Sequence, residues 1–169
     1  SGGYLVPSLM LSGVILILLG MGMPTTGVYI MGVALLAPVL TGKFGLPTMP
    51  VHMFLLFYAC LSAITPPVAV ANFAAASIAG ANPFRLGPYA VKLAIGGFAL
   101  PFFFLFNRGM LQVGDWDAVI ADTLIGLLLV FFASVSLHGF VRRAPIPALL
   151  RLCFAGLAVA LIYPDRLLQ

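Results

Sequence analysis

A segment without any charged side chain runs from residue 44 to residue 84, and two consecutive prolines, Pro66 and Pro67, interrupt it near its middle. Each proline removes a backbone N–H donor and disfavours the helical conformation of the residue before it. A continuous helix therefore cannot pass through Thr65-Pro66-Pro67. This interruption constrains the fold more than any other feature of the chain.

The low fraction of charged residues indicates that the chain folds in a lipid bilayer. Only 7% of its residues are charged and 63% are hydrophobic, whereas about a quarter of the residues of a soluble domain are charged. Two uncharged runs of about 40 residues each exceed the roughly 20 residues that one bilayer crossing needs, so we predict an all-α polytopic membrane protein. A helix broken at membrane depth frees backbone groups that lipid cannot satisfy, so protein or a water-filled cavity must surround it. The break is therefore a candidate site.

A second interruption, Gly20-Met21-Gly22-Met23-Pro24-Thr25-Thr26, lies in the preceding uncharged run, between apolar stretches at 4–19 and 27–40. Each stretch is about 14 to 16 residues, or roughly 21 to 24 Å as a helix, which is short of a full crossing. We interpret them as the arms of a re-entrant hairpin, and the alternative is two thin or tilted spans joined by a tight turn. Two such interruptions are typical of transporters with discontinuous helices.

The rest of the chain is predicted to form transmembrane helices joined by loops. The half-helix at 68–80 is nearly all small residues, which favours an interior position. About three transmembrane helices follow, at 89–106 with a kink at Pro101, at 118–137, and at 148–163. Trp116 is expected to anchor at the membrane interface. Cys60 and Cys153 are expected to be buried thiols, and we predict no cofactor.

Basic residues orient these spans. The loops at 81–92 and 139–151 are separated by two crossings and so share one side, which we predict to be cytoplasmic because it holds most of the basic residues. These are Arg85, Lys92, Arg142, Arg143 and Arg151. The same bias explains the net charge of +4 without nucleic acid. The side of Lys43 stays open, because it depends on whether the Thr-Pro-Pro segment crosses or re-enters.

The two interruptions, in this order and at this spacing, resemble the large (DctM-like) membrane subunit of tripartite ATP-independent periplasmic (TRAP) transporters. The resemblance covers residues 10 to 107. The tip Pro24-Thr25-Thr26 and the two spans after Asn107 are more similar to the fused permeases of the TAXI-type branch. The motifs that carry the resemblance to the TRAP large subunit are Gly20-Met21-Gly22-Met23-Pro24-Thr25-Thr26, Leu36-Ala37-Pro38-Val39, Gly45-Leu46-Pro47, and Ser62-Ala63-Ile64-Thr65-Pro66-Pro67-Val68-Ala69-Val70-Ala71-Asn72-Phe73.

The resemblance implies a topology and a function. The first interruption becomes the tip of the second re-entrant hairpin, the Thr-Pro-Pro break lies in the crossing helix that follows, and Lys43 is extracytoplasmic. Residues 1–80 then hold the hairpin and broken helix, 81–107 complete the TRAP-like region, and 108–169 add two helices. The chain opens Ser1-Gly2-Gly3 without an initiator Met, and we interpret it as the second half of an inverted-repeat transporter. Its implied role is sodium-coupled import, across a bacterial or archaeal inner membrane, of a small organic acid delivered by a periplasmic binding protein. The rest of the permease, with its N-terminal repeat and small-subunit-like helices, would be a further partner.

Sodium is a hard cation that prefers several oxygen ligands, and unwound helices in membranes supply carbonyls and hydroxyls. Helix N-termini near Thr25 and Pro67 would favour an anionic substrate. The predicted sodium-binding residues are Gly20, Gly22, Thr25, Thr26, Thr65 and Pro66, and the predicted substrate-facing residues are Pro24, Pro67 and Asn72.

An intramembrane enzyme and a membrane scaffold are the two alternatives to a transporter. An intramembrane enzyme needs a nucleophile with a base, or clustered acids and histidines, and this chain has no Glu; we predict no enzyme. A non-transporting scaffold or assembly subunit needs no chemistry, but it leaves two helix interruptions unexplained. Asp122 is read as a helix-start or interface residue, and His52 and His138 as residues without a metal or catalytic role.

Overall fold

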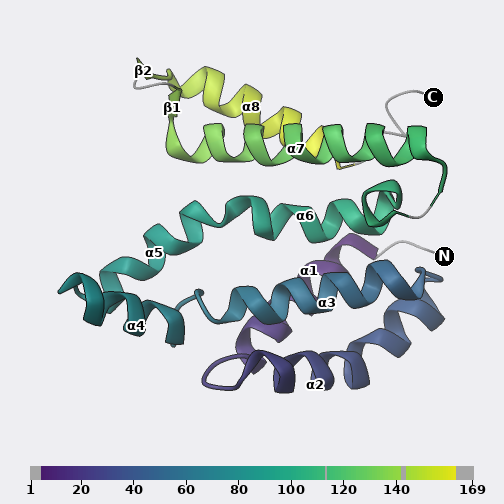
Figure 1. Ribbon diagram of the computed structural model, residues 1–169, viewed down its shortest axis with the longest axis horizontal. Coiled ribbons are helices and arrows are strands. Elements are labelled where there is room, and N and C mark those ends of the chain that lie inside the picture. The colour runs from purple at the N-terminus through teal and green to yellow at the C-terminus, as the bar shows by residue number, and fades with distance from the viewer. Residues whose placement is uncertain (1–4, 113, 142–143, 163–169) are drawn as a thin grey trace. The chain divides into compact units, whose positions relative to one another are not determined.

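The computed structural model describes residues 5–112, 114–141 and 144–162, and this part of the chain is almost entirely helical, which confirms the predicted all-α fold (Figure 1). Arg142 and Arg143, which the sequence assigns to the cytoplasmic side, lie outside the described residues. The chain divides into two compact units, Ser1–Val91 and Lys92–Gln169. The division into 1–80, 81–107 and 108–169 stays a prediction.

The first unit consists of helices joined by short connections. Its elements are α1 (Leu5–Leu19), α2 (Thr25–Pro38), the π-helix η1 (Val39–Lys43), α3 (Thr48–Ser62), α4 (Val70–Ala79) and most of α5 (Pro83–Leu93). The second unit holds α6 (Ile95–Phe106), the 3-10 helix η2 (Gly109–Leu111), α7 (Trp116–His138), the two-residue strands β1 (Phe140–Val141) and β2 (Ala144–Pro145), and α8 (Ala148–Ala160).

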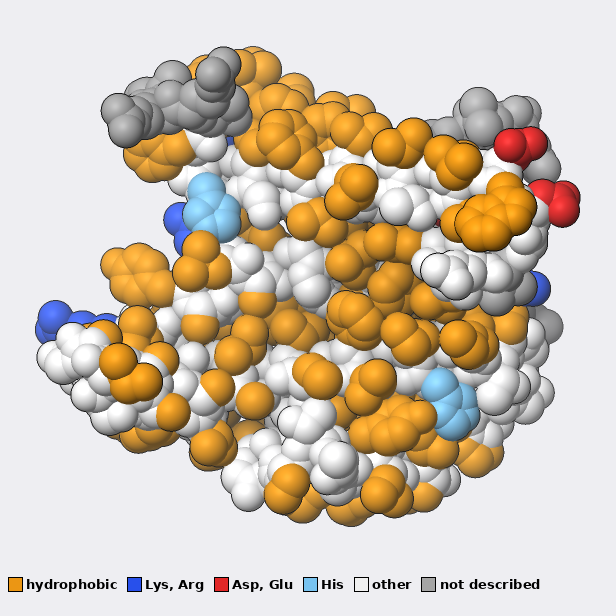
Figure 2. All heavy atoms as spheres, viewed as in Figure 1, with side chains coloured by type: hydrophobic (Ala, Val, Ile, Leu, Met, Phe, Trp, Pro, Cys, Tyr) orange, Lys and Arg blue, Asp and Glu red, His pale blue; other side chains and the backbone are white. Residues whose placement is uncertain are grey.

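Among the described residues, two helical runs are long and apolar enough to cross a membrane, Thr25–Lys43 with 19 residues and Trp116–His138 with 23. The pair of α5 and α6 makes up to three if it counts as one bent span. The second arm of the hairpin is thus longer than predicted, because α2 continues through η1. Figure 2 shows hydrophobic side chains over most of the face in view and few charged ones. Exposed apolar side chains such as Met10, Ile30 and Leu127 suit contact with lipid or neighbouring helices.

In the first unit, α1 and α2 both pack against α3. Glycines let the helix backbones approach: a Cβ at Gly13 would lie 2.7 Å from the ring of Tyr58, and a Cβ at Gly32 would lie 2.5 Å from Leu16. The hydroxyl of Tyr29 and Nδ1 of His52 share a 2.7 Å hydrogen bond between α2 and α3. The core of this unit is aliphatic and aromatic; its fully buried side chains include Leu9, Leu16, Val28, Val51, Phe54 and Leu55.

In the second unit, α7 packs against both α6 and α8. Gly96 of α6 meets Val130, and the rings of Phe132 and Phe154 stack at 5.6 Å between α7 and α8. The carboxylate of Asp122 accepts a 2.8 Å hydrogen bond from the backbone N–H of Gly109 and so holds η2 against α7. Asp122 is therefore a structural residue of this unit.

The expected loop before the next span is instead the start of a helix. The side chain of Asn82 accepts a 2.9 Å hydrogen bond from the N–H of Phe84, and Pro83 occupies the first helical position. Both are favourable at a helix N-terminus. The helix also breaks at Ala94, beside the glycine pair Gly96 and Gly97. Pro101 lies inside α6, and the kink expected there stays a prediction.

Two predictions of burial are wrong, and a third stays a prediction. Cys60 and Cys153 are both exposed on their helices, because an apolar residue of a membrane helix faces lipid as readily as a core. The half-helix α4 is mostly exposed within the described chain: Asn72 and Ala76 are buried, but Ile78 is 89% exposed. Small side chains leave a face that packs only when another helix covers it.

Candidate functional site

The hairpin tip is a tight turn between α1 and α2. The N–H of Gly20 donates to the carbonyl of Leu16 at 2.9 Å and ends α1, and Gly22 has a φ of +86°. That left-handed conformation favours glycine. Pro24 is extended, and α2 begins at Thr25 without a side-chain cap. The first amides of α2 are thus left at the tip without a helical partner.

In the break between α3 and α4, several backbone N–H groups are hydrogen-bonded to carbonyls at the end of α3. After α3 ends at Ser62, the N–H groups of Ala63, Ile64 and Thr65 donate three residues back, at 3.2 to 3.3 Å. The peptide bond between Pro66 and Pro67 is cis, and Ala69 is left-handed with a φ of 44°. Regular helical hydrogen bonds between backbone groups resume only at α4.

Helix α4 also satisfies carbonyls that the break releases. The N–H of Ala71 donates to the carbonyl of Ala63 at 3.0 Å, and the side-chain amide of Asn72 donates to the carbonyl of Ile64 at 3.0 Å. Asn72 is only 4% exposed. Its amide therefore braces the break, and a contact of Asn72 with substrate stays a prediction.

The hydroxyl of Thr65 donates its hydrogen to the carbonyl of Leu61 at 2.7 Å. This leaves its oxygen lone pairs directed away from that carbonyl, which is the arrangement a cation ligand requires. Thr65 is partly buried.

A cavity of about 480 Å³ separates the hairpin tip from the break, and we call it the tip cavity. Thr25 supplies its only side-chain hydroxyl, and the other lining groups are small or apolar, so backbone atoms provide the remaining polarity. Such a lining suits a small solute or cation held by backbone groups. Its residues are Gly20, Gly22, Met23, Pro24, Thr25, Ala63, Val70, Ala71 and Ala74.

A smaller cavity of about 230 Å³, the proline cavity, lies between the break and α5. Pro66 and Pro67 face this cavity and not the tip cavity, and Phe73 and Phe84 meet edge to face at 5.6 Å in its wall. Thr26 and Thr65 line neither cavity. The structure thus brings Gly20, Gly22, Pro24 and Thr25 to one cavity and separates them from Pro66 and Pro67.

Ser62 is a site residue to which the sequence assigned no role. It is 3% exposed, its hydroxyl donates to the carbonyl of Ala59 at 2.7 Å, and a Cβ added at Gly20 would overlap its side chain. Gly20 therefore allows the tip to touch the end of α3. A small residue directly before the break was the available signal for this contact.

His52 and His138 are each bound to protein groups, His52 to Tyr29 and His138 Nδ1 to the carbonyl of Ser134 at 2.9 Å. Within the described residues, no group of three or more His, Cys, Asp and Glu side chains gathers as a metal site.

Comparison with known families matches most of the chain to a transporter component. Residues 2–115, more than half of the 169-residue chain, match the family model of the tripartite ATP-independent periplasmic transporter, DctM component. No curated protein and no solved structure matches the chain.

Proposed function

Because the chain belongs to the DctM component family of tripartite ATP-independent periplasmic (TRAP) transporters, we propose that this permease couples the entry of sodium to the import of a small organic acid. The family and the apolar helices make the chain part of a membrane transporter permease. A transporter family also agrees with the prediction that the chain is not an enzyme.

The observation that carries the proposal is the tip cavity, whose lining comes from both helix interruptions. Two segments far apart in sequence meet there with backbone groups and one threonine hydroxyl. A sodium ion held by oxygens of both segments would draw the hairpin tip toward the break. The geometry thus supports a coupling ion that closes the site.

In this proposal the sodium ligands are the backbone oxygens at Gly20 and Gly22 and the hydroxyls of Thr25, Thr26 and Thr65. The carbonyl of Pro66, the residue that follows Thr65, is a further candidate sodium ligand. The lone pairs of Thr65 support its role, because its hydrogen is already donated to Leu61. Thr26 is exposed and Thr65 is half-buried, and neither lines a cavity, so we keep both as candidate ligands at the edge of the site.

The substrate is proposed to be a small organic acid in the tip cavity beside Pro24. The first amides of α2 carry partial positive charge, and no side chain caps them. Pro67 and Asn72 would act indirectly, by shaping the break. A periplasmic binding protein would deliver the acid, and other permease helices, a fused TAXI-type arrangement among them, would complete the site in the inner membrane of a bacterium or archaeon.

Sodium dependence tests this proposal without knowledge of the substrate. The thermal unfolding of the purified transporter that contains this chain is followed in rising NaCl, with KCl at equal ionic strength as the control. We expect a sodium-specific rise in Tm for the wild type, and for Thr65→Ala a sodium requirement about tenfold higher, since a bond to a charged group is worth roughly 1.5 to 3 kcal/mol.

Thr41→Ala is the matched control, because the Thr41 hydroxyl makes the same kind of bond, to the carbonyl of Ala37 at 2.8 Å, far from the break in sequence. It should keep the sodium response of the wild type. An unchanged response in Thr65→Ala would remove Thr65 from the site. A wild type that distinguishes no sodium from potassium would contradict sodium coupling and favour a scaffold.

A further inference from the structure

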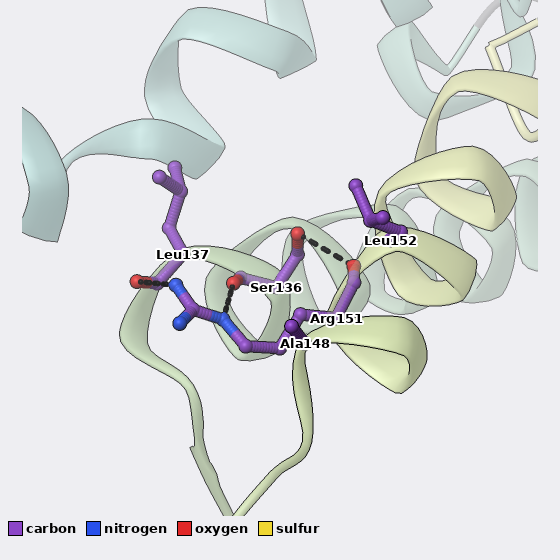
Figure 3. Close-up of a pocket in the computed structure, with 5 residues that line it drawn as sticks. All are labelled: Ser136, Leu137, Ala148, Arg151 and Leu152. Atoms are coloured by element: carbon purple, nitrogen blue, oxygen red, sulfur yellow. Dashed lines mark hydrogen bonds between the residues drawn. The ribbon is translucent and has the colours of Figure 1, made fainter.

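The second unit contains a cavity that the transport site does not use. It has a volume of about 340 Å³ and lies where α7 ends and α8 begins, lined by Ser136, Leu137, Ala148, Arg151 and Leu152 (Figure 3). We call it the α7–α8 cavity. Unlike the tip cavity, its lining includes a permanently charged group, the guanidinium of Arg151.

Arg151 is held in place by the end of α7. Its Nε donates to the carbonyl of Ser136 at 2.8 Å, and one terminal nitrogen donates to the carbonyl of Leu137 at 3.2 Å (Figure 3). The hydroxyl of Ser136 donates back to the carbonyl of Arg151 at 2.9 Å. These bonds fix the direction of the guanidinium before any ligand arrives.

The guanidinium keeps both charge and donors for a ligand. It has five N–H groups, and its hydrogen bonds with the described residues use two of them. The acids of α7 lie toward the other end of that helix: 14 residues separate Asp122 from Ser136, which is roughly 21 Å of helix. The positive charge at the cavity is therefore not neutralised by these acids.

The position of the cavity indicates what kind of anion reaches it. Helix α7 has 23 residues and is long enough to cross a membrane, so its C-terminal turn lies near the headgroup layer. Leu149 and Leu152, in the first turns of α8, are 73% and 69% exposed. A cation beside exposed leucines matches a molecule that carries an anionic head and an apolar tail.

We propose that the α7–α8 cavity binds the phosphate of an acidic phospholipid headgroup, with Arg151 as its charged donor and the leucines of α8 against the acyl chain. Two parallel N–H groups of a guanidinium suit two phosphate oxygens. In sequence, Arg142 and Arg143 add positive charge to the same connection.

Native mass spectrometry of the purified full chain in an uncharged detergent tests this proposal. The probes are phosphatidylglycerol, phosphatidylcholine and inorganic phosphate. We expect the wild type to retain phosphatidylglycerol in preference to phosphatidylcholine, and inorganic phosphate at millimolar concentration not to displace it.

Ala148→Trp fills the cavity and leaves the bonds of Arg151 in place, because Ala148 is exposed and lies in the lining. We expect it to weaken phosphatidylglycerol binding about fivefold, because a filled cavity keeps the headgroup away from Arg151 and one basic residue beside an acidic lipid is worth about 1 kcal/mol. Arg151→Lys keeps the charge but loses the planar fork, and it should reduce the preference over phosphatidylcholine. Arg85→Gln, which removes an exposed charge from α5, is the matched control and should change neither quantity.

The outcomes separate the sources of the anion. Displacement of the lipid by inorganic phosphate would overturn the headgroup assignment in favour of a simple anion site. Equal binding in Ala148→Trp, Arg151→Lys and the wild type would overturn the site altogether. Neither result depends on sodium or on the tip cavity.

Discussion

Gly20→Ala tests how the hairpin tip docks on α3. Gly20 is buried, and a Cβ there would overlap Oγ and Cβ of Ser62 and lie 3.2 Å from the carbonyl oxygen of Leu16. The Cβ of Ser62 is fixed by its backbone, and its hydroxyl is held by the carbonyl of Ala59. Rotation of a side chain therefore cannot relieve the overlap, and the tip must move away from the end of α3.

The expected cost follows from overpacking, which typically destabilises a protein by about 1 to 3 kcal/mol. For a chain of this length, 1 kcal/mol corresponds to about 2 to 4 °C in Tm. Gly20→Ala should thus lower Tm by roughly 2 to 12 °C. Displacement of the tip should also weaken the sodium response, because Gly20 lines the tip cavity.

Circular dichroism of the detergent-solubilised protein measures Tm. Gly42→Ala is the control, since a Cβ at Gly42 meets nothing within 4 Å, and it should be neutral or slightly stabilising. In a double-mutant cycle, Ser62→Gly removes the atoms that overlap, so the double variant should lose less stability than the two single changes add up to, by more than about 0.5 kcal/mol. Additive losses, or equal Tm values for Gly20→Ala and Gly42→Ala, would refute the contact.

Substitutions at three other features give further predictions. Ala69→Gly should raise Tm and Ala69→Val should lower it, because a left-handed residue with a Cβ costs about 1 to 2 kcal/mol; equal Tm values would contradict the left-handed conformation. Tyr29→Phe and His52→Phe should each cost about 0.5 to 1.5 kcal/mol, and together no more than one alone, since they share one hydrogen bond; a cycle without coupling would exclude that bond. Asp122→Ala should lower Tm by removing about 1.5 to 3 kcal/mol of bonding to Gly109, whereas Asp117→Ala, at an exposed position, should not; the same Tm for both would argue against the role of Asp122.

Breaks made by local chemistry were predictable from the sequence. Pro66 and Pro67 interrupt a helix wherever they occur, and the structure has no helix between Ser62 and Val70. Pro24 likewise precedes the start of α2 at Thr25. The signal for the start of α5 is also present in the sequence, as Asn82 followed by Pro83, and the prediction of a loop there is wrong.

Contacts between segments were not predictable in the same way. The overlap that makes Gly20 necessary depends on Ser62, 42 positions later, and local propensity carries no information about that distance. Similarly, Pro66 and Thr65 are neighbours in sequence, but only Pro66 faces the proline cavity. The direction of each side chain at the break depends on the tertiary structure around it.

Exposure was the least predictable property. Hydropathy does not distinguish a side chain that faces lipid from one in a protein core. The sequence therefore predicts buried thiols for Cys60 and Cys153, although both are exposed. The small residues of α4 predicted a face for close packing, and most of α4 is exposed within the described chain.

The exchange of hydrogen bonds between Ser136 and Arg151 has a consequence for biogenesis. Helix α8 has 13 residues and carries an arginine, so it is a poor independent substrate for insertion into a bilayer. The backbone carbonyl and the guanidinium of Arg151 are hydrogen-bonded to the last turn of α7. We therefore expect α7 and α8 to leave the translocation machinery as one hairpin, with the longer helix carrying the shorter one into the membrane.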